Sequence, residues 1–185
     1  MMRSFRPLLL ALVPLLCAPA HLAAAEGETC DSGTAFVVRH GEKSMTGDHE
    51  KDRDAPLSAA GEERAAALAA TLADAGIDAI YSSPYQRTQG TAKALAEKLK
   101  LEVLSYSVAE KDAQASVAAR VMREACGREV LIVGHSNTVP DLLRAFGAEG
   151  VAEIGDEQYD NLYLLHWRRG APAELTRLHY GRPTP

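Results

Sequence analysis

Two short apolar runs, each followed at once by a histidine, constrain the fold of this chain more than any other feature. Residues 36–38 lead into Arg39, His40 and Gly41, and residues 130–133 lead into Gly134, His135 and Ser136. Short runs rich in branched apolar residues are typical of strands that are buried on both faces of a parallel sheet. Open α/β sheets bind their ligands at the carboxyl ends of such strands, so both histidines are candidates for a functional site.

The rest of the chain alternates between helical and extended patterns. The predicted helices cover residues 58–76, 85–99, 112–125 and 140–146, and the further strands cover residues 77–83, 102–105, 161–167 and 174–180. Residues 42–56 are rich in charge and have no hydrophobic period, which predicts a loop. Strands that alternate with helices indicate an α/β fold. We expect a three-layer α/β/α sandwich with a six-stranded, mainly parallel sheet and one antiparallel strand near the C-terminus.

The first 25 residues have the features of a secretory signal peptide. Residues 1–6 contain two arginines and no acid. They are followed by an apolar run over residues 7–18, which is too short to span a bilayer, and by three alanines that end at Ala25. We expect cleavage near Ala25, a periplasmic or secreted location, and a single domain over residues 26–185. The alternative is an uncleaved N-terminal anchor, which Pro14 disfavours because it interrupts the apolar run. No later stretch is long and apolar enough to cross a membrane.

The balance of charge limits the classes of partner. The formal net charge is −5, and acidic and basic residues are interspersed along the chain. A nucleic-acid-binding surface needs clustered lysines and arginines, so we predict no nucleic-acid partner. A local basic pocket for a small anionic substrate is compatible with this pattern.

Four residues converge if the predicted strands are parallel. Arg39 and His40 follow the first strand, Arg87 lies in the first turn of the helix after the second strand, and His135 follows the fourth. The guanidinium fork of arginine suits phosphate oxygens, and a helix start adds its own partial positive charge. One histidine at a strand end is more often structural, and one surface arginine is usually only solvated. All four at one sheet edge, in an acidic protein, indicate an anion-binding site.

At this point the sequence resembles the histidine phosphatase superfamily, whose fold is that of phosphoglycerate mutase. The residues that carry the resemblance are Arg-His-Gly at 39–41, Asp-Ala-Pro-Leu-Ser-Ala-Ala-Gly at 54–61 with Arg64 and Ala65, Tyr-Ser-Ser-Pro-Tyr-Gln-Arg-Thr at 81–88 with Thr91 and Ala92, and Gly-His-Ser at 134–136. Their order and spacing span nearly all of residues 26–185. The mutases of the family carry longer inserted segments, so the resemblance favours hydrolysis and a small exported phosphatase.

The resemblance implies a mechanism that suits these residues. His40 would attack phosphorus and become transiently phosphorylated, which divides the hydrolysis of a phosphomonoester into two displacements. Arg39, Arg87 and His135 would bind the phosphate oxygens and offset their charge, and these cations would depress the pKa of His40. The resemblance implies neither a metal ion nor another cofactor.

The proton donor is where the chain departs from the family pattern. Many members place a catalytic glutamate in a segment with glycine and tryptophan, and residues 106–114 of this chain have no such signature. Glu110 is the nearest carboxylate in position, with Asp112 behind it, and Glu42 is a rival because it follows His40 closely. A leaving group of low pKa could depart without an acid.

Two cysteines remain after cleavage, Cys30 and Cys126. An even number in an exported chain predicts a disulfide, and two unpaired thiols are the alternative. The family fold implies that the strands before His40 and His135 are neighbours. It would place both cysteines at the same level, opposite the active site. We therefore predict a Cys30–Cys126 disulfide, worth a few kcal/mol in the chain-entropy model.

Two other functions compete with an exported phosphomonoesterase. One is a phosphate-recognising binding module without turnover, because the acid is missing. The other is a metal-dependent hydrolase that uses His40, His135 and an acid. Oligomeric state and the identity of the phosphoester do not follow from the sequence.

Overall fold

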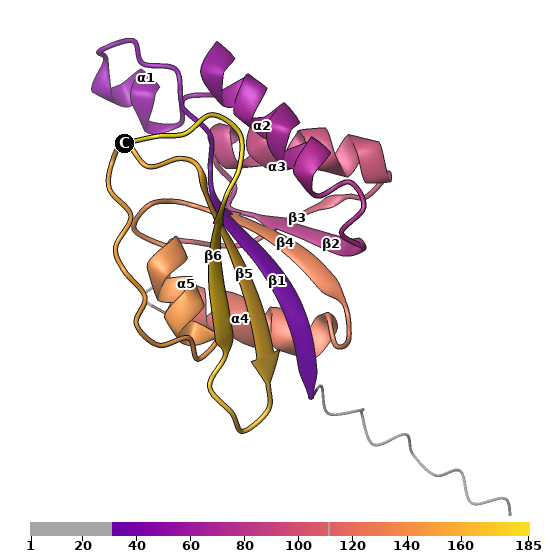
Figure 1. Ribbon diagram of the computed structural model, residues 1–185. Helices are drawn as coiled ribbons and strands as arrows, with labels where there is room; N and C mark the ends of the chain where they lie inside the picture. Colours follow the sequence, from indigo (N-terminus) through magenta and orange to yellow (C-terminus); the bar gives the residue numbers. More distant parts are fainter. Residues whose placement is uncertain (1–30, 111) are drawn as a thin grey trace, which may run out of the picture.

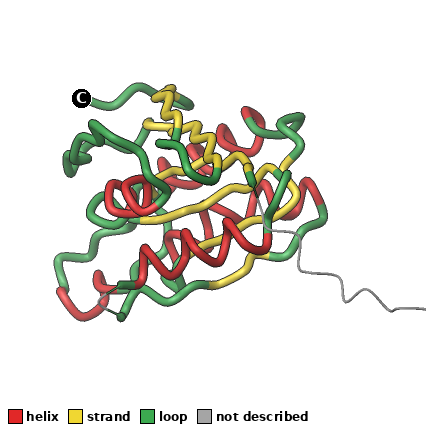
Figure 2. Tube along the Cα trace, turned by 90° about the horizontal axis from the view of Figure 1, so that it is seen from below, coloured by secondary structure: helices red, strands yellow, loops and turns green. Residues whose placement is uncertain are grey.

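The computed structural model describes residues 31–110 and 112–185. A six-stranded sheet runs through the middle of the domain, and helices cover both of its faces (Figure 1; Figure 2). The strands are β1 (Ser32–Arg39), β2 (Ile77–Ser82), β3 (Val103–Ser105), β4 (Glu129–Gly134), β5 (Asn161–Arg168) and β6 (Glu174–His179). The helices are α1 (His49–Arg53), α2 (Ala59–Thr71), α3 (Gln86–Leu99), α4 (Ala113–Glu124) and α5 (Val139–Ala145).

The sheet has the order β3-β2-β4-β1-β5-β6. β1 pairs with β4, β4 with β2, and β2 with β3, all in parallel, whereas β5 is antiparallel to both of its neighbours. The predicted three-layer sandwich, with one antiparallel strand near the C-terminus, is therefore confirmed. The register aligns Arg39 with Gly134, so the carboxyl ends of the two central strands lie side by side.

Each face of the sheet has its own apolar core. α2 and α3 pack on one face through residues such as Leu68 and Leu95, and α4 and α5 pack on the other through residues such as Val121 and Leu143, all fully buried. Burial on both faces explains why β1 and β4 read as continuous apolar runs instead of alternating patterns. Within the described residues, no helix combines the length and apolar character needed to cross a bilayer.

Residues 42–56 contain a short helix, α1, where the charge pattern predicts only a loop. The Asp48 carboxylate caps α1 by accepting hydrogen bonds from the amides of Glu50 and Lys51. The buried Asp52 carboxylate accepts from the amide and hydroxyl of Thr46 and from the amide of Gly47. Polar side chains organise this segment, so a search for hydrophobic periodicity does not detect the helix.

The predicted signal peptide and Cys30 lie outside the described residues. Cys126 lies just after α4, at the end of the sheet opposite to the two histidines. The amide of Gly127 donates to the carbonyl of Ser32 at 2.9 Å, so the chain next to Cys126 runs beside the start of β1.

We expect this proximity to allow the Cys30–Cys126 disulfide. Protein purified without reductant, lacking residues 1–25 and unfolded in denaturant, should then contain no thiol that reacts with an aromatic disulfide reagent. After reduction it should contain two. Two reactive thiols before reduction would contradict the disulfide.

Candidate active site

The structure brings Arg39, His40, Arg87 and His135 together at the carboxyl ends of the parallel strands. The imidazole rings of His40 and His135 lie 5.2 Å apart, measured between centroids. Arg87 lies between them: its Nε is 3.2 Å from His40 Nε2, and its Nη2 is 3.4 Å from His135 Nδ1. The His40 amide donates to the Gly134 carbonyl at 2.9 Å, which fixes the two strand ends relative to each other.

The hydrogen bonds of His40 determine which ring nitrogen carries its proton. Nδ1 lies 2.7 Å from the carbonyl of Gly41, which can only accept, so Nδ1 holds the hydrogen. Nε2 then carries the lone pair and accepts from Arg87. Burial, the His135 ring and the two arginines lower the pKa of His40 to about 3. His40 is therefore a neutral base at physiological pH, with its nucleophilic nitrogen directed at a cation.

Close backbone contacts hold the segment that follows His40. The Gly41 amide donates to the Thr91 hydroxyl on α3 at 2.9 Å. A methyl group added at Gly61, in the first turn of α2, would lie 2.1 Å from the carbonyl oxygen of Glu42. Only glycine fits at this contact, which explains why the family segment at 54–61 ends in Gly61.

His135 is held by a buried chain of hydroxyl groups. Its Nε2 lies 2.8 Å from the Ser83 hydroxyl, which lies 2.7 Å from the Thr88 hydroxyl. The His135 amide donates to Thr138 at 2.9 Å. Burial, with Arg87 and Arg39 nearby, lowers the pKa of His135 to about 4. The site therefore holds two neutral imidazoles beside two arginines.

Each arginine of the site rests on a tyrosine. The guanidinium carbon of Arg39 lies 3.9 Å from the ring centroid of Tyr159, and that of Arg87 lies 4.5 Å from Tyr85. Such cation–π contacts fix the guanidinium planes. Tyr85 also packs edge-on against His135, with centroids 5.2 Å apart. Tyr85 belongs to a family segment, whereas no sequence signal singles out Tyr159.

A loop distant in sequence anchors Arg39. Its Nη1 donates to the carbonyls of Gly155, Asp156 and Gln158 at 2.9, 2.8 and 3.1 Å. Burial lowers the pKa of Arg39 from its ordinary value, and the charges of residues 156, 157 and 159 oppose that change. The loop therefore forms part of the rim of the site and determines where Arg39 points.

The three acids considered as proton donors lie in different surroundings. The Glu42 carboxylate accepts three hydrogen bonds from Arg64, at 2.8 to 3.1 Å, and these bonds lower the pKa of Glu42 against the opposing effect of burial. A donor would need a raised pKa. Glu110 is exposed on the loop before α4, where it lines a hollow with Ser107 and Arg120 and with none of the four site residues. Asp112 stands at the N-terminus of α4.

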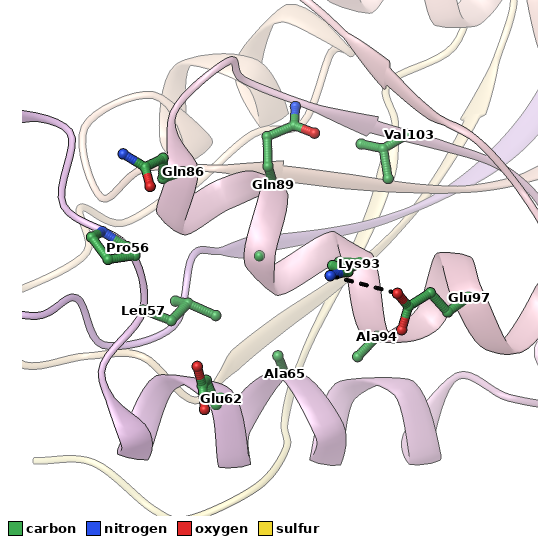
Figure 3. Close-up of a pocket in the computed structure, with 11 residues that line it drawn as sticks. Pro56, Leu57, Glu62, Ala65, Gln86, Gln89, Lys93, Ala94, Glu97 and Val103 are labelled. Atoms are coloured by element: carbon green, nitrogen blue, oxygen red, sulfur yellow. Dashed lines mark ion pairs between the residues drawn. The ribbon is translucent and has the colours of Figure 1, made fainter.

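A metal-dependent hydrolase would need a group of side chains that can hold a metal ion, and a substrate could also bind in a groove away from the four site residues. Across 31–110 and 112–185, no group of three or more histidine, cysteine, aspartate or glutamate side chains is placed to hold a metal ion. A groove of about 600 Å³ lies between α2 and α3, with Leu57 and Ala65 on its walls and a Lys93–Glu97 ion pair of 3.6 Å at its edge (Figure 3). It contains none of the four site residues.

The low pKa of His135 predicts how folding stability depends on pH. The pKa of about 4 in the folded state lies below the ordinary value of 6.5, so the unfolded chain binds more protons between these two pH values, and the stability falls as the pH falls from 7 to 5. We expect His135→Gln to reduce this loss by about 1 kcal/mol, allowing for incomplete burial. Urea unfolding of both proteins at pH 7 and pH 5 measures the difference. Equal losses of stability in the two proteins would contradict the low pKa of His135.

Comparison with known proteins agrees with this geometry. The family model described as histidine phosphatase superfamily (branch 1) matches residues 35–113, which include Arg39, His40 and Arg87. None of the curated proteins compared with the chain matches it.

Several solved structures share the fold at low sequence identity. The protein histidine phosphatase SixA in complex with tungstate has a TM-score of 0.65 and 17% identity, over 80% of this chain and 97% of SixA. Mycobacterial glucosyl-3-phosphoglycerate phosphatase has a TM-score of 0.60 and 18% identity, over 81% of this chain and all (100%) of that protein. Phosphoglycerate mutase from Bacillus anthracis has a TM-score of 0.61 and 18% identity, over 81% of this chain and 94% of that protein. The family model over residues 35–113 and the shared fold together support the predicted phosphatase of the histidine phosphatase superfamily.

Proposed function

We propose that this protein is an exported phosphomonoesterase that works without a metal ion, through a phosphohistidine on His40. The observation that carries the proposal is the His40 ring itself. Its Nδ1 is bonded to the Gly41 carbonyl, and its Nε2 lies 3.2 Å from an arginine nitrogen. A lone pair held beside a guanidinium group suits attack on a phosphate that the same guanidinium binds.

The first step forms one bond and breaks one. The Nε2 lone pair attacks phosphorus, and the bond from phosphorus to the ester oxygen breaks, with its electron pair leaving on that oxygen. Arg39 and Arg87 offset the charge of the other phosphate oxygens. The arriving dianion favours protonation of His135, because it opposes the cationic surroundings that lower its pKa. His135 can then donate to a phosphate oxygen from Nδ1.

The second step returns His40 to its starting state. Water attacks the phosphohistidine, the bond between phosphorus and Nε2 breaks, and its electron pair returns to the ring. The proton lost by the water leaves with the phosphate product or passes to solvent. The Gly41 carbonyl keeps Nδ1–H in place throughout, so the ring carries a positive charge while it is phosphorylated. That charge makes the imidazole a good leaving group.

A second candidate substrate is phosphohistidine on another protein. One observation favours it: the Glu42 carboxylate, which follows His40 closely in the sequence, is bound to Arg64 and has a lowered pKa, so it is poorly suited to protonate a leaving oxygen. Phosphoimidazole can leave as neutral imidazole when its other nitrogen is protonated, and it then needs no acid from the enzyme. The described function of SixA as a protein histidine phosphatase agrees with this candidate.

Trapping of the intermediate tests the proposal. Protein mixed with ³²P-labelled phenyl phosphate and quenched within milliseconds should carry label that is lost in acid and kept in base. Hydrolysis should continue in excess EDTA. Activity lost on chelation and restored by a divalent ion would contradict the metal-free mechanism. Phosphate binding without turnover of any ester or phosphoimidazole would support a binding module instead.

A further inference from the structure

A hollow beside the phosphate site is built from one segment of the chain, residues 43–53. Its volume is about 480 Å³, and its lining residues are Lys43, Met45, Gly47, His49, Asp52 and Arg53. Two of these side chains carry a permanent positive charge. Met45 is 67% exposed, so the hollow also has an apolar wall that a hydrocarbon chain could cover.

Two hydrogen bonds place this hollow next to the phosphate site. Lys43 Nζ donates to the carbonyl of Asp52 at 3.3 Å, and Arg87 Nη1 donates to the carbonyl of Arg53 at 3.1 Å. The Lys43 ammonium and the Arg87 guanidinium therefore bind successive carbonyl groups at the end of α1. Arg87 also contacts His40, so a single side chain links the rim of the hollow to the nucleophile, although none of the four site residues lines the hollow itself.

The side chains that line the hollow include two cations, Lys43 and Arg53, and one anion, Asp52, so the lining is positive by one charge. The Asp52 carboxylate accepts three hydrogen bonds from Thr46 and Gly47. Asp48 caps α1, and the Asp54 carboxylate accepts from the amide of Gln86 at 2.8 Å. Of these three, only Asp52 lines the hollow. Lys43 has three donors and gives one to the Asp52 carbonyl, so donors remain for a ligand.

The same bonds make the segment a fixed part of the site. Asp52 ties α1 to Thr46 and Gly47 in the turn before it, and Asp54 ties the chain after α1 to the start of α3. A subsite that is already ordered loses little conformational entropy when it binds. Binding energy from this region is then available to orient the ester against His40.

We infer that the hollow binds a second anionic group of the substrate, a phosphate or a carboxylate, carried by the alcohol part of the phosphomonoester. This inference rests on the proposed function. It makes the preferred substrate a compound with two anionic groups, with the ester phosphate at His40 and the second group between Lys43 and Arg53. A short hydrocarbon chain between the two groups would lie along Met45.

Matched substrates test the inference. The kcat/KM values of alkane-α,ω-diol bisphosphates with two to six carbons, and of the corresponding ω-phosphorylated carboxylic acids, are compared with those of n-alkyl phosphates of equal length. At low ionic strength we expect at least one chain length to favour the second anionic group by about tenfold, as a charge-assisted contact would give. A preference in the bisphosphate series identifies the second group as a phosphate, and a preference in the carboxylic acid series identifies it as a carboxylate. A ratio near one at every length in both arms would overturn the inference.

Three variants separate a subsite from a general attraction of anions. Lys43→Gln and Arg53→Gln should each lower the ratio by about three- to tenfold. Lys51→Gln removes the same charge from the same segment, but its side chain is 73% exposed and does not line the hollow, so its ratio should stay within about twofold of the wild type. Equal losses in all three variants would mean a diffuse field and would overturn the subsite.

A binding measurement keeps this inference separate from the proposed function. Calorimetric titration with alkylphosphonates and alkane-α,ω-bisphosphonates needs no turnover. If the protein hydrolyses nothing, tighter bisphosphonate binding that Lys43→Gln weakens and Lys51→Gln preserves still supports the subsite. If it hydrolyses phosphomonoesters but binds the two classes equally, the subsite is wrong and the proposed function stands.

Discussion

His40→Ala should lower kcat/KM for an aryl phosphate by at least about 10³-fold and should abolish the trapped phosphoenzyme, because no other side chain takes over the role of a lost nucleophile. The geometry argues for a large effect. His40 Nε2 is in contact with Arg87, and the His135 nitrogens already contact Arg87 and Ser83. His135 therefore cannot replace His40 without giving up its own contacts. Quenched-flow trapping and steady-state kinetics measure the two effects.

A second histidine provides the control for this variant. His166 is exposed on β5, where its Nδ1 pairs with the Thr34 hydroxyl at 2.9 Å, far from the four site residues in the sheet register. His166→Ala should keep kcat/KM within about threefold of the wild type, as expected of a surface change. Label that persists on His40→Ala would show that the nucleophile is misassigned. Equal losses in both variants would point to a folding defect.

The convergence of the four residues at one edge of the sheet can be predicted from the sequence because the ends of buried strands can be recognised in it. The apolar runs before His40 and His135 mark strands buried on both faces, and a parallel sheet brings such ends to one edge. Arg87 lies in the first turn of α3, whose N-cap, Tyr85, directly follows Pro84. Each residue is therefore placed by its own local pattern and by the sheet topology, without knowledge of long-range side-chain contacts.

The supporting contacts do not follow from local patterns. Arg39 is held by carbonyls more than a hundred positions away, and Glu42 is bound to Arg64 on α2. The loop that carries Tyr159 has no periodicity, so its docking on Arg39 is set by tertiary packing alone. The proton donor is hard to predict for the same reason. The pKa of a carboxylate depends on its partner, and the partner of Glu42 lies 22 positions along the chain.

The pair formed by Arg64 and Glu42 should contribute strongly to stability. The Arg64 side chain is 2% exposed, and its Nε and Nη2 bind the Glu42 carboxylate. Its Nη1 donates to the carbonyls of Tyr180 and Arg182 at 3.3 and 3.0 Å, so it also fastens the C-terminal segment. Replacement of Arg64 by methionine leaves an unpaired, half-buried carboxylate and two carbonyls without their donor.

We expect Arg64→Met to lower the free energy of unfolding by about 3 kcal/mol, near the low end for a broken buried pair because Glu42 keeps some contact with solvent. Urea unfolding at pH 7 measures it. Adding Glu42→Gln should restore about 1 to 2 kcal/mol, since the unpaired charge is then gone. Lys93→Gln, which breaks an exposed pair on α3, should cost less than about 0.5 kcal/mol. If Arg64→Met and Lys93→Gln cost the same, then Arg64 does not anchor the segment behind His40, and the position of the nucleophile must depend on Gly41, Gly61 and Thr91 alone.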